Sequence, residues 1–244
     1  MPLRLFFCNS WLLGLIKMKG LIMTIEMLYQ QMLTAMGPRH WLEAGVAPAE
    51  TPWEILWGGI LVQNTNWRNV DYALANLKTA TAFEPERLLA LSDADLTTLV
   101  RPAGFYTRKV PTLKALAGWC EQYNFDLTVM RALPAERLRH ELKLLRGIGD
   151  ETADYFSMYV FHQPTIIIDT YLRRLFGWLN QPLPSNYLQA QQLVMRAWHY
   201  DLTTAWEWHA LVVDFGKQVK TTADFEQSFL ATQRLTLGSQ GSAN

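Results

Sequence analysis

The chain has few cysteines, no excess of either charge and no apolar segment long enough to cross a membrane. Two cysteines among 244 residues exclude a small disulfide scaffold. Lysine plus arginine and aspartate plus glutamate both total 22, so composition alone does not predict a protein coated in positive charge for nucleic acid. Charged residues are too few, at 18%, and aromatic residues too many, at 12%, for an intrinsically disordered chain.

Residues 1–22 differ from the rest, because an apolar run from Leu5 to Ile16 follows a basic start. A secretory signal has this general shape, but polar residues interrupt the run and no small-x-small cleavage site follows it. We expect 1–22 to be a leader or a mis-assigned start without stable structure, with a real helix or a targeting segment as the alternatives. Cys8 and Cys120 are then free thiols of a cytoplasmic protein without a membrane partner.

Apolar residues recur at helical spacing through almost the whole chain, so we expect an all-α protein of about ten short helices. Capping residues mark several helix starts, at Thr24, at Thr51 followed by Pro52, and at Ser92. Only residues 165–168 have a strand-like composition, and four residues do not make a sheet. Helices are expected at 24–36, 52–63, 67–79, 85–91, 93–100, 107–122, 126–132, 134–144, 169–179, 185–199 and 203–219.

A Gly-x-Gly turn lies between two amphipathic segments in the middle of the chain. Gly147, Ile148 and Gly149 follow Arg146, and glycine allows both a positive φ and the close approach of another group to the backbone. A helix that begins near Asp150 would present its free N–H groups beside this turn, where they favour an anion such as phosphate. The pattern predicts a helix-hairpin-helix that grips DNA phosphates through the backbone, although an ordinary helix–helix turn with a glycine cap would have the same sequence.

An aspartate follows three β-branched apolar residues about twenty residues after this turn. Asp169 comes directly after Ile168 and begins a new helix, so its carboxylate would lie at the edge of a dry pocket. The residue could serve only as the N-cap of that helix, because aspartate is a preferred cap, and the two roles can coexist. In combination with the hairpin, we favour a functional carboxylate.

The chain resembles the endonuclease III superfamily of DNA glycosylases, whose signature is a helix-hairpin-helix, a Gly/Pro-rich loop and an Asp. The resemblance rests on GIGDETAD at 147–154 and IIIDTYLRRLF at 166–176. It also includes WEILWGGILVQNTNWRNV at 53–70 and RPAGFYTRK at 101–109. It covers most of the chain, roughly 33–225, and it is specific because three separated segments occur in the right order.

The resemblance implies two helical lobes, with damaged double-stranded DNA bound across the cleft and a substrate pocket between them. We place one lobe at 23–50 together with 164–235, and a helical barrel lobe at 51–163 that contains the hairpin at about 134–161. Residues 236–244 are expected to be a frayed tail. The protein is expected to be a monomer associated with the bacterial nucleoid in the cytoplasm.

The resemblance also implies roles for individual residues. Asp169 would stabilise an oxocarbenium-like sugar and orient water, and Glu151 would be a second carboxylate of the site. Trp67 and Trp41 would bind the flipped base, although a tryptophan is more often a core residue. Gln63 would fill the space that the flipped base leaves, or would cap a helix. The DNA contacts of the hairpin are expected from Arg146, Gly147, Ile148, Gly149 and Thr152.

One departure from endonuclease III concerns the nucleophile. Glu151 stands where members that also cut the backbone have the lysine that forms a Schiff base, and a carboxylate cannot form an imine. Lys143 and Lys109 are not at the right spacing to replace it. The departure predicts a monofunctional glycosylase that leaves an abasic site.

A second departure concerns cofactors. Many relatives hold a [4Fe–4S] cluster on four cysteines, but this chain has two cysteines, and Lys220 stands about where the first ligand would be. Its five histidines show no metal-ligand spacing. We expect no cofactor and no metal site, although the resemblance leaves room for a monovalent cation at the hairpin. Lys217 matches a lysine that helps to close the C-terminal region in cluster-free members.

These departures, with the segments QNT at 63–65 and RPAGFY at 101–106, resemble the bacterial 3-methyladenine DNA glycosylases of the superfamily. An alkylated purine of this kind carries a positive charge, so its glycosidic bond is weak and the leaving base needs no proton. Removal of oxidised or mismatched bases is the alternative within the superfamily. A helix-hairpin-helix protein that binds DNA without catalysis is the alternative outside it.

Overall fold

The computed structural model describes residues 22–41 and 51–238, and the predictions made for 1–21, 42–50 and 239–244 lie outside this part of the chain. Thirteen α-helices account for most of the described residues, together with one 3-10 helix and one pair of two-residue strands. This architecture confirms the all-α prediction. No helix among the described residues is long and apolar enough to cross a membrane.

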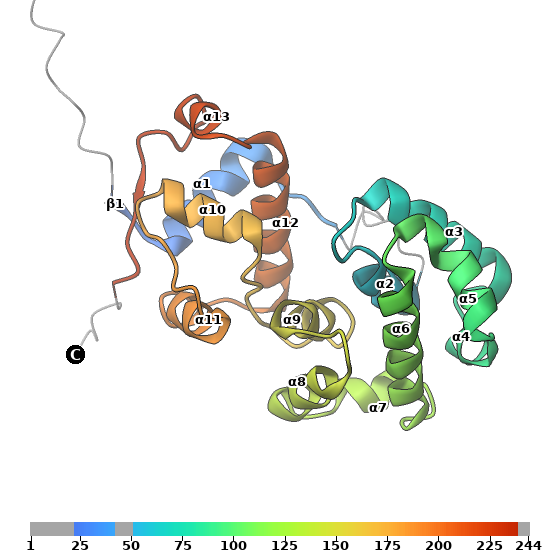
Figure 1. Ribbon diagram of the computed structural model, residues 1–244. Coiled ribbons are helices and arrows are strands. Elements are labelled where there is room, and N and C mark those ends of the chain that lie inside the picture. The colour runs from blue at the N-terminus through green and yellow to red at the C-terminus, as the bar shows by residue number, and fades with distance from the viewer. Residues whose placement is uncertain (1–21, 42–50, 239–244) are drawn as a thin grey trace, which may run out of the picture.

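Residues 51–163 form one group of helices, the barrel lobe, of which the first helices are on the right of Figure 1 and the last two lie near its centre. Its elements are α2 (Pro52–Leu61), α3 (Trp67–Thr81), α4 (Pro85–Ala90), α5 (Asp93–Val100), η1 (Arg101–Ala103), α6 (Tyr106–Glu121), α7 (Leu127–Arg131), α8 (Ala135–Leu144) and α9 (Asp150–Tyr159). Trp57 and Phe156 are fully buried at the centre of its hydrophobic core. The almost wholly apolar sequence of α2 explains why this helix lies inside the lobe.

The other described residues, 22–41 and 164–238, form the terminal lobe on the left of Figure 1. Its elements are β1 (Ile22–Met23), α1 (Ile25–Met36), α10 (Thr170–Trp178), α11 (Tyr187–Arg196), α12 (Leu202–Gln218), α13 (Thr222–Glu226) and β2 (Arg234–Leu235). Both α1 and α10 pack against α12. Phe176 and Trp208 are buried in this second hydrophobic core, which is separate from that of the barrel lobe.

The helix starts follow the capping residues of the sequence. The hydroxyl of Thr24 accepts the third N–H of α1 at 3.3 Å, that of Thr51 the third N–H of α2 at 3.2 Å, and that of Ser92 the third N–H of α5 at 3.1 Å. Each hydroxyl satisfies one of the N–H groups that a helix start leaves without a partner. Pro52 occupies the first turn of α2, where it removes no hydrogen bond of the helix.

Both ends of the described chain are more ordered than the sequence predicts. Ile22, which we assigned to the leader, pairs in parallel with Arg234, and Met23 pairs with Leu235. Thr236, which we assigned to the tail, donates its N–H to the Met23 carbonyl at 2.9 Å. These partners are more than 200 positions apart, so no local pattern reveals them. The strand-like residues 165–168 have no strand partner, and α13 was not expected.

Helix α9, the last helix of the barrel lobe, lies where the two lobes meet and contacts helices of both (Figure 1). It packs against α2 and α8 on one side and against α11 and α12 on the other. Asp154 of α9 is 1% exposed and accepts hydrogen bonds from Arg139 of α8 at 2.7 Å and from Gln191 of α11 at 2.8 Å. This buried network fixes the α8–α9 hairpin relative to the terminal lobe.

Candidate functional site

The predicted hairpin is formed by α8, a short turn and α9. Gly147 has a φ of +88°, and a Cβ atom at this position would lie 2.3 Å from Thr112 Oγ1 of α6, so the turn requires glycine. Ile148 is buried in the core of the barrel lobe, whereas Arg146 and Gly149 are exposed. The turn therefore has a buried anchor and an exposed backbone edge at the start of α9.

Gln63, just beyond the end of α2, reaches across to the hairpin. Its Nε2 donates to the Gly147 carbonyl at 3.1 Å and to Thr152 Oγ1 at 3.2 Å. The side chain therefore binds the hairpin and does not cap α2. Three residues that the sequence predicted separately as DNA contacts form one hydrogen-bonded group.

Asp169 precedes α10 and follows the buried run Ile166–Ile168. Its Oδ1 accepts the N–H of Leu172 at 2.7 Å, so Asp169 is the N-cap of α10. The residue is 7% exposed and lines the cleft described below. Burial is the main reason that the pKa of its carboxyl is raised to about 7. The nearby Glu151 carboxylate also raises this pKa, whereas the hydrogen bond from the Leu172 N–H lowers it. Asp169 is therefore both the N-cap of α10 and a carboxylate in the wall of the cavity.

A cavity of about 530 Å³, the cleft cavity, opens between the two lobes. Asp169 and Glu151 both line it, as does Gln63. Its aromatic and imidazole rings are Trp41, Trp67, Tyr155, Tyr171 and His209. This size and this combination of flat rings with a few polar groups are typical of a small-molecule or cofactor site. The structure thus brings both predicted carboxylates and both predicted tryptophans together.

Glu151 lies in the first turn of α9, and its side chain is exposed. Loss of solvent around the carboxyl in the cleft raises its pKa, and the guanidinium of Arg173 opposes this rise. The two carboxylates therefore differ in environment. Asp169 is buried and held by a hydrogen bond, whereas Glu151 is only partly shielded from solvent and lies at the start of a helix, where a negative charge is favoured.

The two predicted pocket tryptophans are both outside the hydrophobic cores. Trp67, the first residue of α3, is 45% exposed. Trp41 is partly buried, and its ring meets the imidazole of His209 edge-on at a centroid distance of 6.0 Å. The ammonium of Lys217 lies 5.3 Å from the Trp41 ring centroid, which is a cation–π distance.

The segment that carries Trp41 is held on α12 by two carboxylates. Glu207 accepts the backbone N–H groups of Arg39 and His40, the second at 3.1 Å. Asp214 accepts from Arg39 Nε at 2.8 Å. These contacts immediately precede Trp41, so α12 determines where the indole lies in the cleft cavity.

Lys217 was expected to help close the C-terminal region, and its ammonium lies between Trp41 and Asp214, 3.8 Å from Asp214 Oδ1. The end of α12 is held by a different residue. Arg174 of α10 donates to the carbonyls of Gly216 and Val219, the latter at 3.1 Å. Lys217 therefore contacts the wall of the cleft cavity, and Arg174 satisfies the carbonyls of the helix end.

Sequence reasoning missed two residues beside Asp169. His209 of α12 lines the cleft cavity with its Nε2 3.8 Å from Asp169 Oδ2. Its Nδ1 lies 2.6 Å from the hydroxyl of Tyr159, on α9. Forty residues separate His209 from Asp169 and fifty separate it from Tyr159, so no spacing in the sequence indicates the group.

Phe105 was also missed as a candidate for DNA contact. It is 56% exposed, and its backbone has a positive φ of +48°, which is uncommon for a bulky residue. Lys109 holds the neighbouring backbone, since its buried Nζ donates to the carbonyls of Leu61 and Ala103, both at 2.8 Å. These bonds join the loop of Phe105 to the end of α2, next to Gln63.

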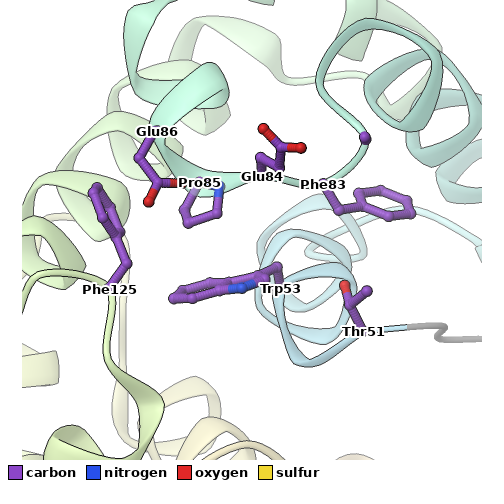
Figure 2. A pocket seen from close by; sticks show the side chains of 8 residues that line it. Thr51, Trp53, Phe83, Glu84, Pro85, Glu86 and Phe125 are labelled. Atoms are coloured by element: carbon purple, nitrogen blue, oxygen red, sulfur yellow. The ribbon is translucent and has the colours of Figure 1, made fainter.

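A second cavity of about 310 Å³ lies entirely within the barrel lobe. Figure 2 shows the indole of Trp53 below Pro85, with the ring of Phe125 beside it and the carboxylates of Glu84 and Glu86 above. None of the residues that the sequence predicted for the site lines this cavity.

The described residues do not supply the donors that a metal ion or a cluster would need. Within 22–41 and 51–238, no group of three or more His, Cys, Asp or Glu side chains is arranged to hold a metal ion. Two cysteines cannot supply the four ligands of an iron–sulfur cluster. Cys120 is buried in the barrel lobe, where burial raises the pKa of its thiol to about 12. No step of a reaction is therefore assigned to such a group.

Comparison with known sequences identifies the family. The family described as HhH-GPD superfamily base excision DNA repair protein matches residues 58–199, more than half of the chain. A protein of Methanocaldococcus jannaschii named as a DNA repair glycosylase is 32% identical over 199 residues, which are 80% of this chain and 87% of the relative. Endonuclease III of Sulfolobus acidocaldarius is 32% identical over 124 residues, 49% of this chain and 52% of that protein.

Solved structures share the fold. The H. pylori 3-methyladenine DNA glycosylase bound to 1,N6-ethenoadenine has a TM-score of 0.61 at 21% identity, over 80% of this chain and 98% of that chain. A non-covalent endonuclease III–DNA complex has a TM-score of 0.63 at 21% identity, over 79% and 84% of the two chains. The chain therefore belongs to the HhH-GPD superfamily of base excision DNA repair proteins, the DNA glycosylase superfamily expected from its motifs.

Proposed function

We propose that the protein is a monofunctional DNA glycosylase that flips an alkylated purine, of the 3-methyladenine type, into the cleft cavity and leaves an abasic site. The observation that carries the proposal is the environment of Asp169, a buried carboxylate in the wall of an aromatic cavity between two lobes. A hairpin protein that only binds DNA has no need of such a carboxylate.

The cavity walls suit a flat cationic ring. Trp41, Trp67 and Tyr155 line the cavity, and aromatic faces attract cations. N-alkylation gives the purine ring its positive charge, so these walls would favour the damaged base over its neutral parent once the nucleotide is flipped out. The structurally similar H. pylori protein is named a 3-methyladenine DNA glycosylase, which supports this choice of substrate by analogy.

The chemistry requires one ionised carboxylate. When the glycosidic bond breaks, both of its electrons go to the cationic purine, which leaves as a neutral base, and positive charge develops on the sugar. The Asp169 carboxylate would stabilise that charge and accept the proton of the attacking water. Its pKa of about 7 means that the active, ionised form becomes dominant above neutral pH.

A strand-cutting lyase step needs an amine that can form an imine with the sugar. Glu151 lies in the cavity wall at the family's lysine position, and none of the residues that line the cavity in the described part of the chain is a lysine. Lys109 is buried, and its ammonium is already bound to two carbonyls. We therefore assign Glu151 the role of a second carboxylate that attracts the cationic base.

The DNA-facing surface would combine the hairpin, Gln63 and Phe105. The exposed edge at Gly147–Gly149 suits a phosphate contact through backbone N–H groups. The exposed ring of Phe105 suits stacking against a base next to the lesion. Because the chain has no net charge, non-specific DNA affinity should be modest and salt-sensitive. We propose that one monomer binds one duplex.

A base-release assay tests the proposal. Duplex DNA treated with a methylating agent is incubated with the protein, and the freed bases are separated by chromatography. We expect alkylated purines from treated DNA, none from untreated DNA, and strand breaks only after alkali. Strand cleavage without alkali would contradict the monofunctional assignment, and release only from oxidised DNA would contradict the substrate.

One observation favours a second candidate, the removal of oxidised or mismatched bases. Burial raises the pKa of Asp169 to about 7, so a protonated Asp169 near neutral pH could protonate a neutral leaving base. Duplexes with a single oxidised or mismatched base, used in the same assay, separate this candidate from the first.

A further inference from the structure

His209 lines the cleft cavity beside Asp169, Tyr159 contacts His209, and the proposed reaction uses neither of them. The Tyr159 hydroxyl lies 2.6 Å from His209 Nδ1, and His209 Nε2 lies 3.8 Å from Asp169 Oδ2. Tyr159 is 5% exposed, and only 11% of the His209 side chain is accessible. The three side chains form a line from the packed interface of α9 and α12 to the wall of the cleft cavity.

We infer that His209 is a positioning residue, which presents its Nε2–H to Oδ2 of Asp169 while the Tyr159 hydroxyl fixes its tautomer. This inference rests on the proposed role of Asp169 in base release. It assigns no proton transfer to His209 and no contact with the substrate.

The tautomer follows from the two neighbours of the imidazole. Burial, together with the nearby Lys217 ammonium, lowers the pKa of His209 to about 4, so the ring is neutral and carries one N–H. Burial raises the pKa of Tyr159 well above its usual value, so the phenol keeps its proton. A phenol that donates to Nδ1 leaves the single ring proton on Nε2, the nitrogen that faces Asp169.

The opposite tautomer would direct the Nε2 lone pair at a carboxylate oxygen, which is repulsive when Asp169 is ionised. The present separation of 3.8 Å is too long for a hydrogen bond, but catalytic hydrogen bonds are often long without substrate and shorten in the complex. Oδ1 of Asp169 is already held by the Leu172 N–H at 2.7 Å. A donor at Oδ2 would therefore fix the plane of the carboxylate and favour its ionised form.

Other charged or titratable groups surround this line on every packed element. They are Glu151 and Tyr155 on α9, Arg174 on α10, and Glu207, Asp214 and Lys217 on α12. Asp169 is the member of this neighbourhood whose pKa is raised to about 7. Asp169 is therefore expected to contribute to the pH profile of base release near neutrality.

Nitrogen-15 NMR of the histidine side chains tests the tautomer independently of any substrate. Loss of a signal in His209→Gln assigns the residue. We expect a neutral ring protonated on Nε2 at neutral pH in the wild-type protein, and a mixture of tautomers in Tyr159→Phe. A wild-type ring protonated on Nδ1, or unchanged by Tyr159→Phe, would overturn the inference.

Single-turnover base release at a series of pH values tests the effect on Asp169. Removal of the donor in His209→Leu should lower the rate roughly 10-fold at neutral pH and move the midpoint of the profile to higher pH, because a hydrogen bond to a charged group is lost. His209→Gln, whose amide can still donate, should stay within about threefold of the wild-type rate. His199→Gln, on the exposed loop between α11 and α12, is the matched control and should match the wild type.

The outcomes separate the two proposals. If Asp169→Asn abolishes base release while a folded His209→Leu keeps the wild-type rate and profile, only the positioning role is wrong. If Asp169→Asn remains fully active, the proposed mechanism fails and the inference fails with it. Should His209→Leu not fold, as judged by thermal unfolding, the tautomer measurement and the rate profile of Tyr159→Phe decide the question, and an unchanged Tyr159→Phe overturns it.

Discussion

Two cavities of this molecule are lined by similar types of residue, but their acidic side chains have different environments. The cleft cavity and the Trp53 cavity (Figure 2) both have aromatic walls and two acidic residues. In the cleft, Asp169 is 7% exposed, accepts a backbone N–H and lies close to a neutral imidazole. In the Trp53 cavity, Glu84 is exposed and forms an ion pair with Arg87 at 2.6 Å.

This difference shows that the environment of the acidic residues, more than the aromatic walls, distinguishes a candidate catalytic cavity. An exposed acid at a helix start remains solvated and is favoured by the helix dipole, so it needs no buried partner. Burial of a carboxylate disfavours its charged form, so a buried acid requires specific partners. In the cleft cavity Asp169 has such partners on α10 and α12, whereas the acids of the Trp53 cavity are exposed and do not require them.

The strongest test of this contrast is Asp169→Asn. The amide can still cap α10 but carries no negative charge for the sugar, so we expect base release from methylated DNA to fall at least about 1000-fold. Asp201→Asn is the matched control, because Asp201 also caps a helix, accepting the N–H of Thr204 at 2.8 Å, but lies on the surface. A substantial rate in Asp169→Asn would remove the functional distinction between the two cavities.

The same pair of variants should have opposite effects on stability. The native pKa of Asp169 is about 7 and its ordinary value is 3.8, so the folded state binds more protons than the unfolded state between these pH values and stability falls as pH rises through them. The difference corresponds to about 4 kcal/mol. Asp169→Asn should therefore gain stability relative to the wild type as pH rises, with the full gain above about pH 7.

Hydrogen bonds to Thr204 lower the pKa of Asp201, so its contribution to stability is present at neutral pH and is lost in acid. Asp201→Asn should accordingly be less stable than the wild type at neutral pH. Denaturant unfolding of both variants at acidic and mildly alkaline pH gives the comparison. Parallel pH dependence in the two variants would contradict the burial argument.

A smaller loss is expected from Glu151→Gln. The carboxylate lines the cleft cavity but faces solvent, so its attraction for a cationic base is partly screened. We expect base release to fall about 10-fold, with little change for a neutral damaged base. Single-turnover rates on both kinds of substrate measure this difference, and equal losses on the two would show that the charge of Glu151 does not act on the base.

Gln63→Ala tests the connection between the cleft and the DNA surface, which the Trp53 cavity lacks. The variant loses the hydrogen bonds to Gly147 and Thr152, so the hairpin is held less firmly and the space next to a flipped base is empty. Affinity for damaged duplex should fall about fivefold, since each lost bond contributes roughly 1 kcal/mol or less. Gln30→Ala, on the exposed face of α1, is the control. Fluorescence anisotropy with a labelled duplex measures both, and equal affinities would mean that Gln63 only packs.

The local sequence was sufficient to predict those structural features that depend only on neighbouring residues. Thr24, Thr51 and Ser92 cap their helices as expected, because a cap acts on an N–H three residues later. The Gly147 turn was also predictable, since a positive φ favours glycine. The resemblance to a known family then indicated which of these local features to propose as DNA contacts.

Features that depend on distant residues could not be predicted. The pairing of Ile22 with Arg234 joins segments that are far apart in sequence. His209 was considered only as a metal ligand, because nothing in its own helix indicates the aspartate that it faces. No sequence pattern indicated the role of Asp154 either, although its buried contact with Gln191 fixes the hairpin on the terminal lobe.

The smallest effect is expected from Glu84→Gln in the Trp53 cavity. The ion pair of Glu84 with Arg87 is exposed on both sides, so its removal should change the free energy of unfolding by less than about 0.5 kcal/mol. Base release should equal that of the wild type, because Glu84 lies in the barrel lobe away from the cleft residues. Glu151→Gln, the same chemical change in the other cavity, is the direct comparison. If Glu84→Gln slowed base release as much as Glu151→Gln, burial and partners of a carboxylate would not distinguish the two cavities.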